Sequence, residues 1–427
     1  MKIKIKPVKK IVGDITVPGD KSISHRALMI GSLAMGSTKI KGLYLESDDC
    51  NYTAQAFRDM GINIREEGDI TIVDGKGLHG LKKPGNPLYV GNSGTSMRIL
   101  AGILAGQNFE STITGGAGIS ARPMKRVVEP LSMMGVKIRA KDGEYPPLTI
   151  AGGKVRPIIY KNLIASAQIK SAILFAGLYA KGNTRVVEPV KSRDHTERML
   201  KYFGAKIKIE DDRVSVRGGG ELKARSLSIP GDISSASFFM IAATLLKGSR
   251  VKIRNVSINP TRAGILKVLS MMGSDIRIIN KKKGFEPAAD IVIKHSRTHG
   301  ITITKDMMPS IIDELPVIFV LASLSEGITV IEGAGELRVK ETDRIASMRN
   351  GLKAMGAGFR VKGDNIVIEG IGRLKGADLQ SFGDHRTCMA LAVAALTAEG
   401  DSEIEGAESV SKSFPSFFDM LFKLTSA

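Results

Sequence analysis

Six times along the chain, an apolar stretch of helical length is followed by a short run that alternates apolar and polar residues. The alternation is typical of a β-strand, whereas the uniformly apolar stretch before it predicts a buried helix. The copies read ALMIGSLAMGSTKIKG, RILAGILAGQNFESTITG, SAILFAGLYAKGNTRVVEP, SFFMIAATLLKGSRVKIRNV, PVIFVLASLSEGITVIEG and CMALAVAALTAEGDSEIEG. A glycine stands in each copy where we expect a helix C-cap: Gly36, Gly106, Gly182, Gly248, Gly327 and Gly400.

A second pattern lies between these copies, a helical segment that ends in Met-Gly or Phe-Gly and continues as a strand. Its copies read FRDMGINI, LSMMGVKI, LKYFGAKIKI, LSMMGSDIRI and LKAMGAGFRV. A repeat of about 65–80 residues is too long for a common solenoid, and 427 residues are comfortable for two domains. We therefore expect an α/β fold with two domains of three stacked units.

The composition narrows the class of protein. Tryptophan is absent and aromatic residues make up only 5% of the chain, which argues against base stacking as the main activity. The N-terminal MKIKIKPVKKIVG alternates Lys with Ile and predicts an edge strand, not a signal peptide. The longest apolar stretches fall far below the roughly 18 residues that span a bilayer. Cys50 and Cys388 lack CxxC spacing and indicate a reducing compartment, so we expect a cytoplasmic protein.

The formal net charge of +19 has three explanations. A solvated Lys-rich surface, a nucleic-acid interface and a positive cleft for small acidic substrates all fit the total charge. The positions of the charges decide between them. If the three inner helices of a domain run in parallel, their N-termini share one face, and that face is suited to bind anions.

Charged and polar residues do gather just before the apolar helices. The start of the first apolar helix, PGDKSISHRAL, holds Lys21, Ser22 and Arg26. The simpler interpretation of this segment is that Ser22 or Ser24 only caps the helix. The second start, GNSGTSMR, has two glycines that let a ligand approach the backbone, and Arg98 follows one turn later.

The middle starts carry fewer charges. Arg122 precedes a proline in SARPMKR, and SAQIK opens the third helix with Ser166, Gln168 and Lys170. In the fourth start, PGDISSAS, we expect Asp232 and Ser234 to have structural roles.

Carboxylates appear at the last starts. Asp313 and Glu314 precede the fifth helix, where a half-buried carboxylate among cations is a plausible general base and a helix-dipole charge is the alternative. RVKETDR holds Lys340, Glu341 and Arg344, with Asp343 or Thr342 as N-cap, and an exposed salt-bridge cluster is the alternative there. The sixth start contributes Asp384, His385 and Arg386, and SKSFP contributes Lys412. Because solvated charges would scatter over the repeat, this concentration favours a cationic substrate cleft.

The motifs GDKSISHRAL, GNSGTSMR, ARP, SAQIK, KETDR, GDHR and SKSFP occur in this order from Asp20 to Pro415. Together they resemble the family of 5-enolpyruvylshikimate-3-phosphate (EPSP) synthases, also called 3-phosphoshikimate 1-carboxyvinyltransferases. The resemblance implies two domains of three βαβαββ units, an inside-out α/β barrel, with the active site in the cleft between the domains. The implied domains are residues 1–20 plus 232–427, and residues 21–231.

The resemblance also implies a reaction in the shikimate pathway to aromatic amino acids. The enolpyruvyl group of phosphoenolpyruvate passes to the 5-hydroxyl of shikimate 3-phosphate through a tetrahedral intermediate, and phosphate leaves. The implied phosphoenolpyruvate ligands are Lys21, Asn92, Gly94, Arg122, Gln168, Arg344, Arg386 and Lys412. Shikimate 3-phosphate would contact Lys21, Ser22, Arg26, Ser166, Ala167, Gln168, Asp313 and Lys340, and also Ser192 or Arg193 of SRDHTER.

Proton transfer then needs a base and an acid. Asp313 is the candidate base for the 5-hydroxyl, and Glu341, with Lys21, is the candidate donor to the methylene carbon. Nearby cations favour an ionised Glu341, although two dianionic phosphates would offset them. His385 either tunes Glu341 or caps its helix. No metal or cofactor is expected, and the partners are small molecules, with no nucleic acid, no membrane and a monomeric chain.

The sequence departs from the family pattern in two places, and two other classes of protein remain as alternatives. Ala167 stands where the family often has a second Ser, and RDHTER, SAQIK and NPTR resemble a subgroup noted for tolerance to glyphosate, a competitor of phosphoenolpyruvate. Gly94 is nevertheless retained, so tolerance stays a hypothesis that inhibition at low glyphosate would refute. UDP-N-acetylglucosamine enolpyruvyl transferase is the nearest rival, but Ala117 replaces its loop cysteine. A basic nucleic-acid-binding protein is the rival from another class.

Overall fold

The structure is a computed structural model that describes residues 1–425, and the chain divides into two compact units. Unit 2 comprises Gly19–Ile229, and unit 1 comprises Met1–Pro18 together with the chain from Pro230 onward. Unit 1 is therefore discontinuous in sequence. Both boundaries between the units, after Pro18 and after Ile229, lie two residues before the domain boundaries expected from the sequence.

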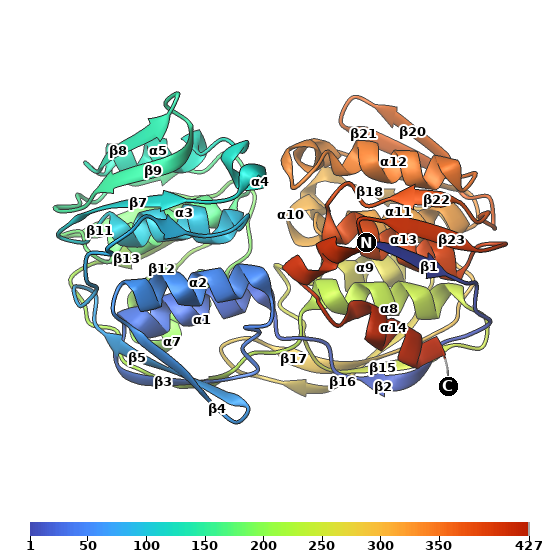
Figure 1. Ribbon diagram of the computed structural model, residues 1–427, viewed down its shortest axis with the longest axis horizontal. Helices are drawn as coiled ribbons and strands as arrows, with labels where there is room; N and C mark the ends of the chain where they lie inside the picture. Colours follow the sequence, from blue (N-terminus) through green and yellow to red (C-terminus); the bar gives the residue numbers. More distant parts are fainter. Residues whose placement is uncertain (426–427) are drawn as a thin grey trace. The chain divides into compact units, whose positions relative to one another are not determined.

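Unit 2 contains three copies of one arrangement, an inner helix, a strand, an outer helix and a β-hairpin (Figure 1). The inner helices are α1 (Lys21–Leu33), α3 (Gly94–Leu104) and α6 (Ala167–Gly177), and the outer helices are α2 (Asp48–Asp59), α5 (Lys125–Met133) and α7 (His195–Tyr202), with the short α4 (Ala117–Ser120) before α5. The sheets have the strand orders β14–β3–β5–β4, β6–β7–β9–β8 and β10–β11–β13–β12. In each sheet, the strand after the inner helix pairs in parallel with one neighbour and antiparallel with the hairpin.

The strands of unit 2 are short, as expected for small sheets that cover a helical core. Their bounds are β3 (Met35–Lys41), β4 (Asn63–Glu67), β5 (Ile70–Lys76), β6 (Leu88–Tyr89), β7 (Glu110–Thr114), β8 (Lys137–Lys141), β9 (Tyr145–Ala151), β10 (Ile159–Lys161), β11 (Asn183–Val187), β12 (Lys206–Ile209), β13 (Arg213–Arg217) and β14 (Ser226–Ser228).

Unit 1 repeats the arrangement with a changed third copy. Its inner helices are α8 (Ile233–Leu245), α11 (Leu315–Leu324) and α13 (His385–Leu396), and its other helices are α9 (Gly264–Met271), α10 (Met308–Ile311), α12 (Arg344–Ala354), α14 (Phe417–Thr425) and the 3-10 helices η1 (Lys305–Met307), η2 (Ala334–Val339) and η3 (Ala407–Lys412). Two sheets have the orders β16–β17–β15–β2 and β18–β19–β21–β20. The third, β1–β23–β22, has no hairpin, and the N-terminal strand β1 occupies that edge. The predicted N-terminal edge strand is confirmed.

Several strands of unit 1 alternate buried residues with more exposed ones, the pattern of sheets with one face on the core. Their bounds are β1 (Lys2–Ile5), β2 (Val12–Ile15), β15 (Arg250–Ser257), β16 (Asp275–Lys282), β17 (Ala288–Lys294), β18 (Thr302–Ile303), β19 (Ile328–Ile331), β20 (Gly358–Lys362), β21 (Asn365–Glu369), β22 (Asp378–Gln380) and β23 (Ser402–Glu405).

The inner helices form the core, which explains why they lack a polar face. Every residue of α13 is buried, as are all residues of α8 from Ile233 to Thr244. In unit 1, α14 and the residues just before it add an aromatic layer: the Phe238 and Phe417 rings lie 5.7 Å apart and those of Phe239 and Phe414 6.0 Å apart. Each fully buried Phe or Leu side chain contributes about 1.5–3 kcal/mol of stabilisation. The sequence prediction of an α/β fold with buried inner helices is confirmed.

The expected role of the closing glycines was wrong at most positions. The inner helices end before them, so Gly36, Gly182, Gly248, Gly327 and Gly400 lie in the turns or strand starts that follow, all with positive φ. The glycines that follow a C-cap residue directly, with φ of 85° to 94°, belong to the second pattern: Gly61, Gly135, Gly204, Gly273 and Gly356. Each outer helix reaches the next strand within three residues, and a left-handed residue directly after the C-cap makes that short turn.

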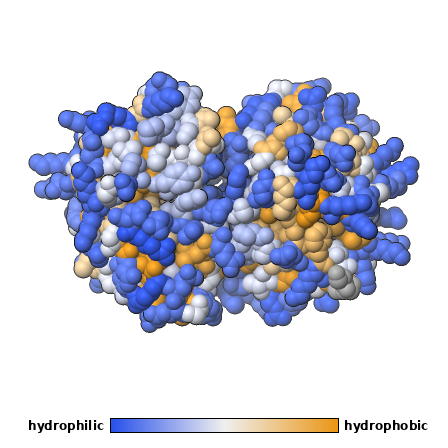
Figure 2. Space-filling view, in the orientation of Figure 1, coloured by the Kyte–Doolittle hydropathy of each residue, from blue (hydrophilic) through white to orange (hydrophobic). Residues whose placement is uncertain are grey.

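Hydrophilic residues dominate the visible face of each unit (Figure 2). Much of the +19 charge therefore belongs to the solvated surface. Within residues 1–425, no single helix has the length and apolar character needed to cross a membrane. Lys305–Ile311 and Leu315–Leu324 together have that length and character, but the chain bends by 116° between them.

Candidate active site

In unit 2, the start of α1 presents the predicted cation Lys21. Asp20 is the N-cap, because its carboxylate accepts from the backbone N–H of Ile23 at 2.9 Å. The alternative of Ser22 or Ser24 as the cap was therefore wrong. The Lys21 Nζ donates to Asp49 Oδ2 at 2.8 Å, with both side chains mostly buried. Asp49 comes from α2 and orients the ammonium, a partner that sequence reasoning missed.

Arg26 lies deeper on α1 and is almost fully buried. Its guanidinium donates to the Thr196 hydroxyl at 2.6 Å, to the Ser22 carbonyl at 2.8 Å and to the Ser171 hydroxyl at 3.0 Å. These bonds join α1 to α6 and α7. The predicted contact of Arg26 with a phosphate stays a prediction.

The starts of α3 and α6 lie together in unit 2. Arg98 Nη1 donates to Gln168 Oε1 at 2.8 Å, and Gln168 Nε2 donates to Thr95 Oγ1 at 3.1 Å. A Cβ placed on Gly94 would lie 2.7 Å from Arg98 Nη1 and 3.2 Å from Arg122 Nη1. Two predicted ligands, Gly94 and Arg122, are therefore close neighbours, and glycine leaves room for both guanidinium groups.

The remaining predicted residues of unit 2 have different surroundings. Asn92 is exposed, and its Oδ1 accepts from the Ile119 N–H at 3.0 Å. Ser166 is the N-cap residue of α6 without a side-chain cap bond, and Ala167 follows it. Ser192 is buried, and its hydroxyl donates to Glu188 at 2.6 Å, whereas Arg193 is half-buried.

His25, the histidine of the SHR motif, lies in the core of unit 2. Burial, together with the charges of Lys21 and Arg26, holds the pKa of His25 well below its usual range. Its Nδ1 lies 2.8 Å from the Thr53 hydroxyl, which in turn lies 2.6 Å from that of Ser96. His25 is thus a neutral core residue that joins α1, α2 and α3.

In unit 1, Asp313 and Glu314 precede α11 and differ sharply in surroundings. Glu314 is fully buried, and both its oxygens accept from Arg262 Nη1, at 2.8 and 2.9 Å. The Ser234 hydroxyl contacts both partners. Asp313 keeps 16% of its side chain exposed and lies between Arg344 Nη1 at 3.5 Å and Arg386 Nη2 at 3.7 Å. Asp313, the more exposed of the two carboxylates, therefore lies next to two guanidinium groups.

Arg344 is the centre of the unit 1 group. Its side chain is 1% exposed, and it donates to Asp384 at 2.7 Å and to Glu341 at 2.5 Å besides facing Asp313. Burial lowers the pKa of Arg344, but the carboxylates of Asp384, Glu341 and Asp313 outweigh burial and raise that pKa above its usual value. Asp343 caps α12 by accepting from two backbone N–H groups at 3.0 Å, so the predicted N-cap is confirmed.

The start of α13 completes this group. Asp384 is the N-cap and accepts from the Arg386 N–H at 2.8 Å, so the alternative of His385 as the cap was wrong. Arg386 Nη1 donates to the Asp313 carbonyl at 3.0 Å, and Lys412 Nζ donates to the Gly383 carbonyl at 2.6 Å. Lys340, half-buried, follows η2. The starts of α11, α12 and α13 thus converge through side-chain bonds.

The fourth start behaves as expected. Asp232 caps α8 by accepting from the Ser234 N–H at 2.7 Å, which confirms its structural role. Its Oδ1 also lies 3.6 Å from Arg262 Nη2. Arg262, from the NPTR segment, was missed as an organising residue although its motif stood out in the sequence.

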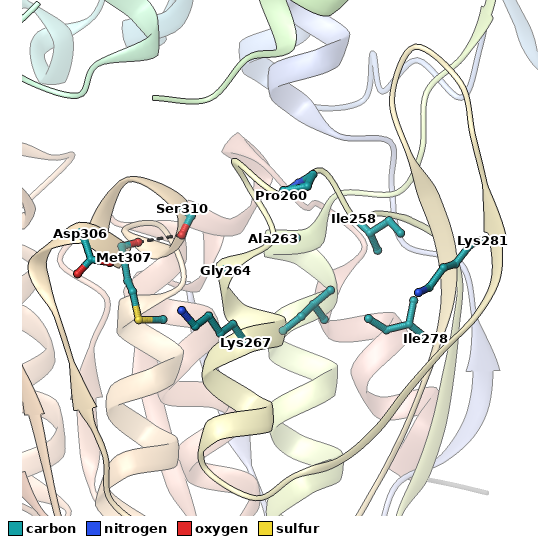
Figure 3. A pocket seen from close by; sticks show the side chains of 11 residues that line it. Ile258, Pro260, Ala263, Gly264, Lys267, Ile278, Lys281, Asp306, Met307 and Ser310 are labelled. Atoms are coloured by element: carbon teal, nitrogen blue, oxygen red, sulfur yellow. Dashed lines mark hydrogen bonds between the residues drawn. The ribbon is translucent and has the colours of Figure 1, made fainter. Parts of the chain in front are cut away.

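A pocket of about 440 Å³ in unit 1 lies apart from these residues. Its lining includes Pro260, Lys267, Lys281, Asp306 and Ser310, and none of the predicted site residues is among them (Figure 3). Figure 3 shows these side chains arranged around α9 and η1, with the Ser310 hydroxyl bonded to the Met307 carbonyl at 2.8 Å. This pocket is therefore separate from the predicted site.

The fold of repeated α/β units with polar inner-helix starts is that of the enolpyruvyl transferases. The enolpyruvyl transferase NikO from Streptomyces tendae shares it at a TM-score of 0.77 and 19% identity, over 99% of this chain and 96% of that one.

The chain belongs to the EPSP synthase (3-phosphoshikimate 1-carboxyvinyltransferase) family, whose profile matches residues 5–421. A 3-phosphoshikimate 1-carboxyvinyltransferase from Brevibacillus brevis is 49% identical over 99% of this chain and 100% of that protein. An EPSP synthase structure from Acinetobacter baumannii has a TM-score of 0.89 at 45% identity, covering 99% of this chain and 98% of that one. These findings do not favour either rival, the UDP-N-acetylglucosamine transferase or the nucleic-acid-binding protein.

Proposed function

We propose that the helix starts of unit 2 and those of unit 1 act on one pair of substrates, phosphoenolpyruvate and shikimate 3-phosphate. The enzyme transfers the enolpyruvyl group to the 5-hydroxyl of shikimate 3-phosphate and releases phosphate. The products are 5-enolpyruvylshikimate 3-phosphate, a precursor in aromatic amino acid biosynthesis, and inorganic phosphate.

Phosphoenolpyruvate would be held by cations and by close approach to the backbone. Its proposed ligands are Lys21, Asn92, Gly94, Arg122, Gln168, Arg344, Arg386 and Lys412. The proximity of Gly94 to Arg122 in unit 2 supports this assignment. The convergence of Arg344 and Arg386 on Asp313 in unit 1 supports it as well.

Shikimate 3-phosphate would be held by a second set of residues, which shares Lys21 and Gln168 with the first. Its proposed ligands are Lys21, Ser22, Arg26, Ser166, Ala167 through its backbone, Gln168, Arg193, Asp313 and Lys340. Of the two residues left open in SRDHTER, we choose Arg193. The Ser192 hydroxyl is buried and already donates its proton to Glu188, whereas a phosphate oxygen needs a donor.

The single observation that carries the mechanism is Asp313 between two arginines. Opposite charges at this distance favour the ionised carboxylate, and an ionised carboxylate can accept the proton of the 5-hydroxyl. The freed oxygen attacks the substituted enol carbon while the methylene carbon gains a proton, which gives the tetrahedral intermediate. Loss of a methyl proton and departure of phosphate then restore the enol group.

Glu341, with Lys21, is the proposed donor of the methylene proton. In this structure a Glu341 oxygen accepts from Arg344, a contact suited to the carboxylate form. Glu341 must therefore take up a proton before it can donate one. The negative charge of two phosphorylated substrates would favour that uptake.

The test is release of phosphate from phosphoenolpyruvate with and without shikimate 3-phosphate. Release that requires both substrates, together with formation of the enolpyruvyl ether, supports the proposal. Equal release without shikimate 3-phosphate, or no release with both, contradicts it.

We further infer that the chain works in the cytoplasm as a monomer. Both cysteines are free and buried, which suits a reducing compartment. Burial raises the pKa of Cys388 to about 12, so this thiol is poorly reactive. Sedimentation equilibrium with and without both substrates tests the monomer, and a stable dimer would contradict it.

A further inference from the structure

A buried ionic cluster lies beneath the predicted substrate residues of unit 2. Lys170, on α6, is 2% exposed at its side chain, and its Nζ lies 2.6 Å from Glu188 Oε2 and 2.7 Å from Glu197 Oε1. A third bond reaches the Ser192 carbonyl at 3.4 Å. The three contacts match the three donors of an ammonium group. The cluster joins α6, the segment after β11, and α7.

The bonds that leave this cluster lead to predicted ligand residues. Glu188 Oε1 accepts from the Ser192 hydroxyl at 2.6 Å and from Asn162 Nδ2 at 3.0 Å. The same Asn162 amide donates to the Ser166 carbonyl at 3.2 Å. One branch therefore fixes the residue before Arg193, and the other fixes the N-cap of α6, two positions before Gln168.

Stability alone does not account for this cluster. Two carboxylates face one ammonium, and within residues 1–425 the buried Glu197 Oε2 has no hydrogen-bond partner. Burial raises the pKa of Glu197, and the contact with the Lys170 ammonium does not fully offset the effect of burial. Buried ionic groups of this kind are often no more stabilising than apolar residues of similar volume. Their benefit is a fixed geometry, because each charge accepts only a specific arrangement of partners.

We propose that Lys170 is a positioning residue that sets the shikimate 3-phosphate contacts of Ser166 and Arg193 without touching the substrate. The inference rests on the proposed function, which assigns both residues to that substrate alone. Lys170 draws Glu188 and Glu197 together, and this holds the Ser192–Arg193 backbone against the start of α6. The proposed phosphoenolpyruvate contacts on α1 and α3 do not depend on these bonds, and neither does Gln168, which bonds to Arg98 and Thr95 instead.

The primary experiment compares Lys170→Met with the matched control Lys208→Met. Lys208 pairs with Glu210 at 2.7 Å in the same unit but is exposed, so the control removes a surface ion pair. Lys170→Met should raise KM for shikimate 3-phosphate about ten- to a hundredfold, the usual result of misplacing binding groups through their supports. KM for phosphoenolpyruvate should stay nearly unchanged, and Lys208→Met should change neither constant. An unchanged KM for shikimate 3-phosphate, or an equal rise in both constants, overturns the inference.

Two further variants separate positioning from folding. The triple variant Lys170→Met, Glu188→Gln, Glu197→Gln removes every charge of the cluster. It should be more stable to unfolding than Lys170→Met alone, while KM for shikimate 3-phosphate stays high. Lys170→Arg retains the charge and should give an intermediate KM. Recovery of both stability and KM in the triple variant would show a purely structural role. Failure of the unsubstituted enzyme to require shikimate 3-phosphate would instead refute the proposed function itself, and that measurement involves no variant.

Discussion

The two units place charge at their helix starts in opposite ways. In unit 2, Arg26 and Arg98 donate to hydroxyl, carbonyl and amide oxygens, which are all neutral. In unit 1, Arg344 faces three carboxylates, and Arg262 Nη1 donates to both oxygens of Glu314. The arginines of unit 2 thus have neutral partners in these bonds while Lys21 pairs with Asp49, whereas unit 1 interleaves arginines and carboxylates.

This difference suggests a division of labour. A neutral partner orients a guanidinium without cancelling its charge, so such a residue keeps its attraction for a phosphate. A carboxylate between guanidinium groups stays ionised and cannot rotate freely, which suits a proton acceptor. In the proposed mechanism, unit 2 supplies Lys21 and most of the anion ligands, and unit 1 supplies the two carboxylates that move protons, Asp313 and Glu341.

Asp313→Asn tests this division most severely. The amide cannot accept the hydroxyl proton, so kcat should fall by about 10²–10⁴-fold, while KM for both substrates changes far less. Phosphate release measured at saturating substrates gives the result. Asp306→Asn, an exposed carboxylate of η1 in the same unit, is the control. A kcat for Asp313→Asn close to that of the control would remove Asp313 from the role of base.

Arg262→Met tests whether the buried charges of unit 1 must stay paired. Glu314 would remain buried without the guanidinium that contacts both its oxygens, and the loss of stability should be about 3–5 kcal/mol. Arg254, which pairs with Asp14 on the exposed surface of the same unit, provides the control; Arg254→Met should cost under about 1 kcal/mol. Urea unfolding measures both.

The double variant Arg262→Met, Glu314→Gln shows the cause of that loss. Removing the stranded carboxylate charge should recover a large part of the stability. If the double variant is as unstable as Arg262→Met, lost packing of the long side chain explains the effect better than an unpaired charge.

Gly94→Ala tests the anion grip of unit 2. The added methyl lies too close to the Arg98 and Arg122 guanidinium groups and should displace them. KM for phosphoenolpyruvate should rise about tenfold, roughly 1.4 kcal/mol, and inhibition by its competitor glyphosate should weaken too. Gly85→Ala is the control, because its new Cβ meets open space. Steady-state kinetics decides, and an unchanged KM would show that the guanidinium groups adjust freely.

His25→Gln should change the folding stability only at low pH. The folded-state pKa of His25 lies below 6.5, so the unfolded chain binds the proton more tightly. Folding stability is therefore unaffected by His25 well above pH 6.5 and falls as the pH drops below that value, by up to about 1.4 kcal/mol per pH unit. The substitution should flatten this slope between pH 7 and 5, as urea unfolding would show. The exposed His79→Gln should leave the slope in place, and equal slopes in all three proteins would contradict the interpretation.

The repeats, the buried inner helices and the gathering of charge at helix starts were all predictable from sequence. Each depends on spacing along the chain, which hydrophobic periodicity records directly. The glycine positions were misjudged because the same residue serves both a helix end and the turn beyond it. The changed third repeat of unit 1 was missed because its hairpin is replaced by β1, from the other end of the chain.

The sequence by itself determined which residues stand at the helix starts, and the motifs named the family. Only the tertiary structure decided which of those charges meet. Arg26 and Thr196 are 170 positions apart, and Arg262 and Glu314 are 52 apart. Glu188, in an ordinary strand ending, showed no pattern of its own. Pairing and burial depend on how helices pack through space, and desolvation then fixes each charge to its partner.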